Sequence, residues 1–86
     1  MNRIALIGII VENNEISEEI NRLLHDFSDY IVGRMGIPYR KGAVCIISVV
    51  VDAPCDVISS LSGKLGSLPG ASVKTVYSKS TVNAAN

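Results

Sequence analysis

The stretches IALIGIIV, at residues 4–11, and AVCIISVVV, at residues 43–51, decide how this chain folds. A strand that lines a one-sided core alternates apolar and polar residues. In both stretches, the two alternating rows are apolar, with Gly8 and Ser48 as the exceptions. We therefore predict two strands at the centre of a sheet whose two faces must both be covered. A chain of 86 residues is too small to cover both faces itself.

The rest of the chain alternates between helical and extended patterns. Apolar residues at helical spacing predict helices at 15–27 and 52–66, the first capped by Asn14 or Asn13 and the second with Pro54 in its first turn. The predicted extended elements are a strand at 30–37, a hairpin loop at 38–42, a strand at 43–51, a Pro69-Gly70 turn and a strand at 71–77. In the strand at 30–37, Ile31, Met35 and Ile37 are expected on one face and Arg34 on the other, and its two glycines favour an edge position or a bulge.

The order strand, helix, strand, strand, helix, strand is typical of the ferredoxin-like βαββαβ arrangement, an α+β fold. Right-handed crossovers then predict an antiparallel sheet in the order 4-1-3-2 with both helices on one face. We expect one domain at 1–79 and a disordered polar tail at 80–86. Because the second face would stay apolar, we predict that it is covered by another copy of the chain, in a homodimer or a dimer of dimers.

Composition narrows the classes of partner. Eight Lys and Arg balance eight Asp and Glu, so no basic surface points to direct nucleic-acid binding or to a membrane. No apolar run approaches the roughly 20 residues that span a bilayer, and the N-terminus lacks the order of a signal peptide. We expect a cytoplasmic protein. Cys45 and Cys55 make no disulfide framework and fit a reducing compartment.

The sequence offers no catalytic constellation. We find no nucleophile with its base, no paired carboxylates in a common cleft and no phosphate-binding loop, so we predict no enzyme and no cofactor. His25 is the one histidine and lacks neighbours at ligand spacing, so we predict a surface histidine and no metal site. Cys55 lies at an expected helix start, where a redox-sensing thiol is the alternative to a small first-turn residue.

Two features could hold a ligand. Glu12, Asn13 and Asn14 lead into the first helix, where free amides and the positive end of the helix dipole favour an anionic group. Arg34 and Lys74 are expected together on the outward face of the sheet, where they could meet an anion or a partner chain between subunits. The alternatives are helix capping for the first feature, and solubility or interface salt bridging for the second.

Five stretches of the sequence, taken together, carry a family resemblance. They are EN at residues 12–13, DYIVGRMGIPY at 29–39, IISVVVDAP at 46–54, LSGKLG at 61–66 and PG at 69–70. These phrases resemble the small bacterial proteins described as regulators of the iron-only ([FeFe]) hydrogenase system, over roughly residues 3–79. That family is similar to ACT domains and to the C-terminal domain of nickel-responsive regulators.

The resemblance implies an ACT-like, non-enzymatic regulatory module that forms homo-oligomers and senses a small molecule or acts through another regulatory protein. The histidine set that nickel regulators use is absent, so nickel sensing is not implied. The loop at 12–15 also lacks the glycine of amino-acid-binding ACT domains. The alternative function is a scaffolding oligomer that contacts hydrogenase maturation proteins and binds no ligand.

Overall fold

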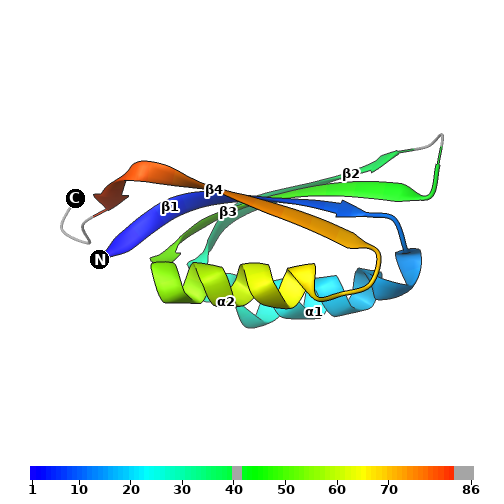
Figure 1. Cartoon of the computed structure of the whole chain (residues 1–86), viewed down its shortest axis with the longest axis horizontal. Helices are drawn as coiled ribbons and strands as arrows, with labels where there is room; N and C mark the ends of the chain where they lie inside the picture. Colours follow the sequence, from blue (N-terminus) through cyan, green and yellow to red (C-terminus); the bar gives the residue numbers. More distant parts are fainter. Residues whose placement is uncertain (40–41, 83–86) are drawn as a thin grey trace.

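In the computed structural model, which describes residues 1–39 and 42–82, a 4-stranded antiparallel sheet carries both α-helices on one side (Figure 1). The elements are β1 (Asn2–Val11), the 3-10 helix η1 (Asn14–Ile16), α1 (Ser17–Asp26), the 3-10 helix η2 (Ser28–Tyr30), β2 (Ile31–Tyr39), β3 (Val44–Pro54), α2 (Cys55–Gly66) and β4 (Ala71–Val82). The strand order β2-β3-β1-β4 is the predicted 4-1-3-2 order. The α+β class and the βαββαβ order are confirmed.

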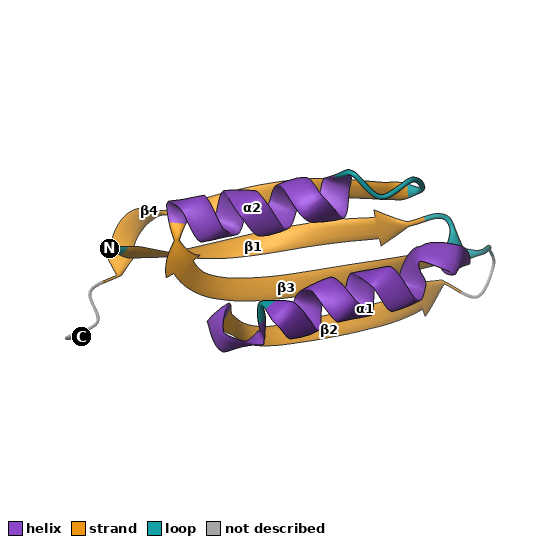
Figure 2. Ribbon diagram, turned by 90° about the horizontal axis from the view of Figure 1, so that it is seen from below, coloured by secondary structure: helices purple, strands orange, loops and turns teal. Residues whose placement is uncertain are grey.

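The helices cover one apolar row from each central strand. Figure 2 shows α2 over β4 and β1, and α1 over β3 and β2. Ile7 of β1 lies opposite Val49 of β3, and both side chains are fully buried beneath the helices. The buried core comprises Ala5, Ile7, Ile9, Val11, Ile16, Ile20, Leu24, Ile47, Val49, Val51, Ala53, Ile58, Leu61 and Leu65. The sequence pattern grouped the residues of these two rows correctly, and the structure shows that the rows of Ile7 and Val49 face the helices.

The other face of the sheet has no covering layer in the described residues, and we call it the open face (Figure 1). The register brings together the alternate residues of all the strands on this face. Its apolar members are Ile4, Leu6, Ile10, Met35, Ile37, Tyr39, Val44, Ile46, Val50 and Val76. The second apolar row of each central strand is therefore a surface of the protomer.

A β-bulge in β2 changes which side chains face the helices. Ile31 lies opposite Val51, in the core row, but the register shifts before Gly33, which lies opposite Val50 in the open row. One additional residue in a strand sends all later side chains to the opposite face. Met35 and Ile37 therefore lie on the open face, and the prediction that they share a face with Ile31 is wrong.

The strands run further than the sequence pattern predicted. Pro38 and Tyr39 belong to β2, because they pair with the start of β3 and because an edge strand tolerates proline. β3 continues to Pro54, and α2 starts one residue later. β4 passes Tyr77 and ends at Val82, opposite Asn2, so residues 80–82 are strand and not disordered tail. The predicted loop residues 40–41 and tail residues 83–86 lie outside the described residues.

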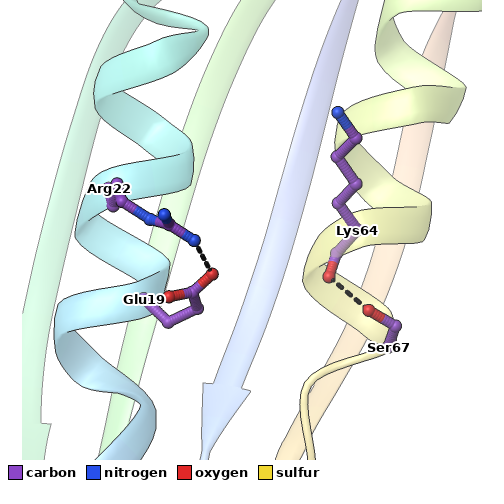
Figure 3. A network of polar contacts seen from close by, with 4 residues as sticks. All are labelled: Glu19, Arg22, Lys64 and Ser67. Atoms are coloured by element: carbon purple, nitrogen blue, oxygen red, sulfur yellow. Dashed lines mark hydrogen bonds and ion pairs between the residues drawn. The ribbon is translucent and has the colours of Figure 1, made fainter.

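Two of the side-chain contacts of the helices are local, and a third lies between Lys64 of α2 and Phe27 at the end of α1. On α1, Glu19 forms an ion pair with Arg22 (Figure 3). Near the end of α2, the Ser67 hydroxyl donates to the Lys64 carbonyl at 2.8 Å (Figure 3), while the Lys64 ammonium lies 5.4 Å from the ring centroid of Phe27.

Within the described part of the chain, no helix is long and apolar enough to cross a membrane.

Gly70→Ala is expected to destabilise the protein by at least about 2 kcal/mol. Gly70 has φ +92°, and a Cβ at this position would lie 2.5 Å from the Asn13 Cβ. The matched control is Gly63→Ala in α2, where an added Cβ meets no atom within 4 Å and should stabilise by about 0.5–1 kcal/mol. Urea unfolding at one protein concentration measures both changes. A neutral Gly70→Ala would contradict the close approach of the two turns.

Candidate functional site

The turn between β1 and η1 carries the first predicted ligand residues. Asn13 caps η1, because its Oδ1 accepts a hydrogen bond from the Glu15 N–H at 3.0 Å. The Glu12 N–H donates to the Gly70 carbonyl at 2.8 Å, whereas the Asn14 side chain is exposed. The capping alternative therefore describes what Asn13 does in this structure, and ligand binding at the turn stays a prediction.

Arg34 and Lys74 lie on opposite faces of the sheet. Arg34 lies opposite Val49 in the core row, and its Nη2 donates to Asn21 Oδ1 of α1 at 2.7 Å. Lys74 lies opposite Gly8 on the open face and is exposed. The prediction that the two cations share the outward face is wrong, because the β2 bulge turns Arg34 toward the helices. The structure therefore does not assemble the five predicted ligand residues into one site.

A cleft of about 190 Å³ lies between α1 and the β2 side of the sheet, and we call it the α1–β2 cleft. Its lining residues are Val11, Ser17, Ile20, Asn21, Arg34, Gly36, Cys45 and Ile47. Val11, Ile20 and Ile47 are buried, whereas Arg34 and Asn21 are exposed. The cleft thus combines an apolar floor with a mouth that carries a guanidinium and an amide.

Sequence reasoning missed most of this cleft. Ser17 and Asn21 are four residues apart and so share a helix face, which is the one local signal that they act together. The hydrogen bond between Asn21 and Arg34 depends on the β2 bulge and on the position of α1 over the sheet. The glycines of β2 favour a bulge or an edge but do not fix the position of the bulge, and no short sequence pattern places α1 over the sheet.

The open face has a hollow of its own, of about 490 Å³, over Gly8. Its walls are apolar except for Ser72 and Lys74 on the edge strand β4. Ile10 and Ile46 contribute to the lining, and they are 42% and 40% exposed. The hollow exists because Gly8 has no side chain between the β3 and β4 rows.

The remaining chemical candidates stand apart from these features. His25 is exposed, as its position in the predicted helix indicated, and Cys55 is exposed at the start of α2. Over residues 1–39 and 42–82, no three His, Cys, Asp or Glu side chains come together in a group that could hold a metal ion.

Comparison with known proteins identifies the family. The TM1266-like family, described as "Iron-only hydrogenase system regulator, putative", matches residues 3–75. The structure of an uncharacterized protein, TM1266 of Thermotoga maritima, superposes with a TM-score of 0.88 at 39% identity, over 92% of this chain and 100% of that one. None of the curated proteins matches.

A second structural match concerns the fold alone. A formyltetrahydrofolate deformylase from Pseudomonas putida KT2440 superposes with a TM-score of 0.61 at 13% identity, over 85% of this chain and 28% of that one. At this low identity, the likeness carries no information on ligand or activity. The family match over residues 3–75 and the close structural neighbour agree with each other, and the chain belongs to the TM1266-like family.

Proposed function

We propose that this chain is a non-enzymatic, ACT-like regulatory module of the iron-only hydrogenase system, which acts in the cytoplasm as a homo-oligomer and responds to a small effector. Family membership supports the regulatory role. The single observation that carries the oligomer is the apolar open face. A module of this size regulates through contacts with other molecules, and the open face offers exposed apolar side chains from all four strands for such contacts.

The open face is too apolar for a surface in permanent contact with water. Leu6 is 45% exposed, Ile37 is 50% exposed and Val76 is 65% exposed. Burying a fully exposed side chain of this size contributes about 1.5–3 kcal/mol, so covering these partly exposed ones contributes about half of that each, and large contiguous apolar patches are rare on monomers. The free energy available from covering this face therefore favours assembly.

A second copy of the chain is the partner that best fits this face. On β1 and β3, the aliphatic pairs Leu6/Val50 and Ile10/Ile46 flank Gly8 and Ser48, and these side chains can interdigitate with an identical surface across the roughly 10 Å spacing of packed sheets. An isologous contact places the same patch on both subunits. Lys74 lies on the edge strand β4, where an interface has its polar rim. The open row also contains Asp52, opposite Ile4, and its Oδ1 is buried without a hydrogen-bond partner among the described residues.

A ligand screen separates the sensor from the scaffold. Amino acids, nucleotides, small carboxylates and divalent metals are each added while the melting temperature is followed. An effector at about a hundred times its dissociation constant stabilises by about 2.7 kcal/mol, which raises the melting temperature by several degrees. A flat screen would leave the alternative function, an oligomer that contacts hydrogenase maturation proteins without binding a ligand.

The regulatory role is tested in a host that carries an iron-only hydrogenase. Deleting the gene for this chain is expected to change hydrogenase activity, and the wild-type gene should restore it. The variant Ile46→Asp, which places a charge on the open face, should fail to restore it. The variant Ser60→Glu, which places a charge on the exposed side of α2, should restore it fully. Unchanged hydrogenase activity in the deletion strain would contradict the proposal.

A further inference from the structure

Arg34 is the charged residue in the lining of the α1–β2 cleft, and its charge has no carboxylate partner among residues 1–39 and 42–82. Its Nη2 donates to Asn21 Oδ1, an uncharged acceptor. On α1, Glu19 pairs with Arg22, and Glu18, three residues before Asn21, forms no ion pair with Arg34 in the part of the chain that the structure describes. A guanidinium has five N–H donors, so Arg34 retains donors for a further acceptor at the mouth of the cleft.

Asn21 is oriented to add another donor. Because its Oδ1 accepts from Arg34, its amide nitrogen is left to donate. Ser17 lies one helical turn earlier on α1, and its hydroxyl belongs to the same cleft. The mouth of the cleft therefore presents a planar cation, an amide N–H₂ and a hydroxyl. This donor set matches a carboxylate, which accepts two parallel bonds from a guanidinium.

The apolar floor of the cleft favours a ligand with an aliphatic carbon chain. Val11, Ile20 and Ile47 form this floor and carry no polar side-chain atom. Space is left above them because β2 has Gly36 here, and a Cβ added to Gly36 would meet no atom within 4 Å. The volume of about 190 Å³ is below the roughly 300–1,000 Å³ of sites for drug-sized ligands. A short aliphatic chain fits, and a nucleotide does not.

We propose that the α1–β2 cleft binds a small aliphatic carboxylate, with the carboxylate on Arg34 and Asn21 and the hydrocarbon chain against Val11, Ile20 and Ile47. This inference rests on the proposed function, because it names the class of effector and its site. One carboxylate carries the single negative charge that one guanidinium balances. Bound there, the ligand bridges α1 and the edge strand β2.

The test uses the full chain labelled with ¹⁵N and titrated with acetate, butyrate, isovalerate and succinate, with uncharged isovaleramide as the control. We expect isovalerate or butyrate to shift the amide signals of Ser17, Asn21, Arg34 and Gly36. Isovaleramide should leave these signals unchanged, because it cannot form the ion pair. Shifts confined to the turn at residues 12–14, or to the open face, would overturn the assignment of this cleft. Absence of shifts with every carboxylate would also overturn it.

Two kinds of variant separate binding from folding. Arg34→Met keeps the length of the side chain and removes the charge, so the affinity should fall about tenfold or more, while Arg34→Lys should restore part of it. Gly36→Val fills the cleft without removing a contact and should abolish binding while the fold stays intact. Gly33→Val adds the same side chain to the opposite face of β2, where a Cβ also meets no atom within 4 Å, and should bind as the wild type does.

The outcomes also distinguish this inference from the proposed function. The molar mass of every variant is measured in the same samples. If the wild-type chain is oligomeric but Arg34→Met binds isovalerate as tightly as the wild type, the cleft assignment fails and the regulatory oligomer stands. If the chain is monomeric and Gly36→Val abolishes binding, the cleft assignment stands and the open-face oligomer fails.

Discussion

Ile46→Asp is expected to convert the homo-oligomer into monomers. Ile46 lies near the centre of the open face, on β3, opposite Ile10, and is 40% exposed in the protomer. An isologous interface would bury the new carboxylate twice, once from each copy, and each burial carries the desolvation cost of a charge. The dissociation constant should therefore rise about a hundredfold or more. Light scattering and sedimentation equilibrium at micromolar concentrations measure this change.

Two further variants make the result decisive. Ile37→Asp introduces the same charge on the same face from the edge strand β2, where the protomer tolerates it more easily, and should also favour monomers. Ser60→Glu adds a charge on α2, on the opposite side of the sheet, and should keep the wild-type mass. A wild-type chain that is monomeric at these concentrations, or an Ile46→Asp variant of wild-type mass, would refute assembly through the open face.

Ile7→Ala is expected to lower the free energy of unfolding of the protomer by about 2–5 kcal/mol. Ile7 is 0% exposed and packs between the sheet and the helices, so the truncation leaves a cavity. Domains of this kind are stable by only about 5–15 kcal/mol. The loss is therefore a large share of the total and should shift the urea midpoint markedly.

The neighbouring residue on β1 supplies the matched control. Leu6 is 45% exposed on the open face, so Leu6→Ala should cost the protomer less than about 1 kcal/mol. Both truncations are made in the Ile46→Asp background, so that unfolding reports on the protomer and not on assembly. Urea unfolding followed by circular dichroism, with an unchanged dependence on denaturant, compares them. Equal losses at Ile7 and Leu6 would contradict the assignment of one face to the core and the other to the surface.

The two predictions depend on the part of the fold that sequence reasoning described best. The strand order, the central position of the two aliphatic strands and the assignment of their rows all follow from residue alternation and from the handedness of crossovers. The prediction of which β2 side chains share a face was wrong. The glycines of β2 indicated a bulge or an edge, but not the position of the bulge, and a shift of one residue reversed the faces of Arg34 and Met35.

The candidate site was less predictable than the fold. The residues at 12–14 were chosen because a helix begins there, and Asn13 is engaged in the cap that such a beginning needs. Arg34 was chosen as a cation on the outward face beside Lys74, but the structure places it on the helix side of the sheet. The partners of Arg34 come from α1, which is separated from it in the chain by η2 and the start of β2.

Residue alternation, helical spacing and turn-forming residues were thus sufficient for the class of fold, for the buried core and for the apolar second face of the sheet. These features depend on local geometry with periods that every strand and helix obeys. The bulge in β2, the approach of Gly70 to Asn13, the pairing of β4 as far as Val82 and the α1–β2 cleft were settled by the packed chain. Each of them arises from contacts between segments that are distant in sequence, and such contacts form only where the elements meet in space.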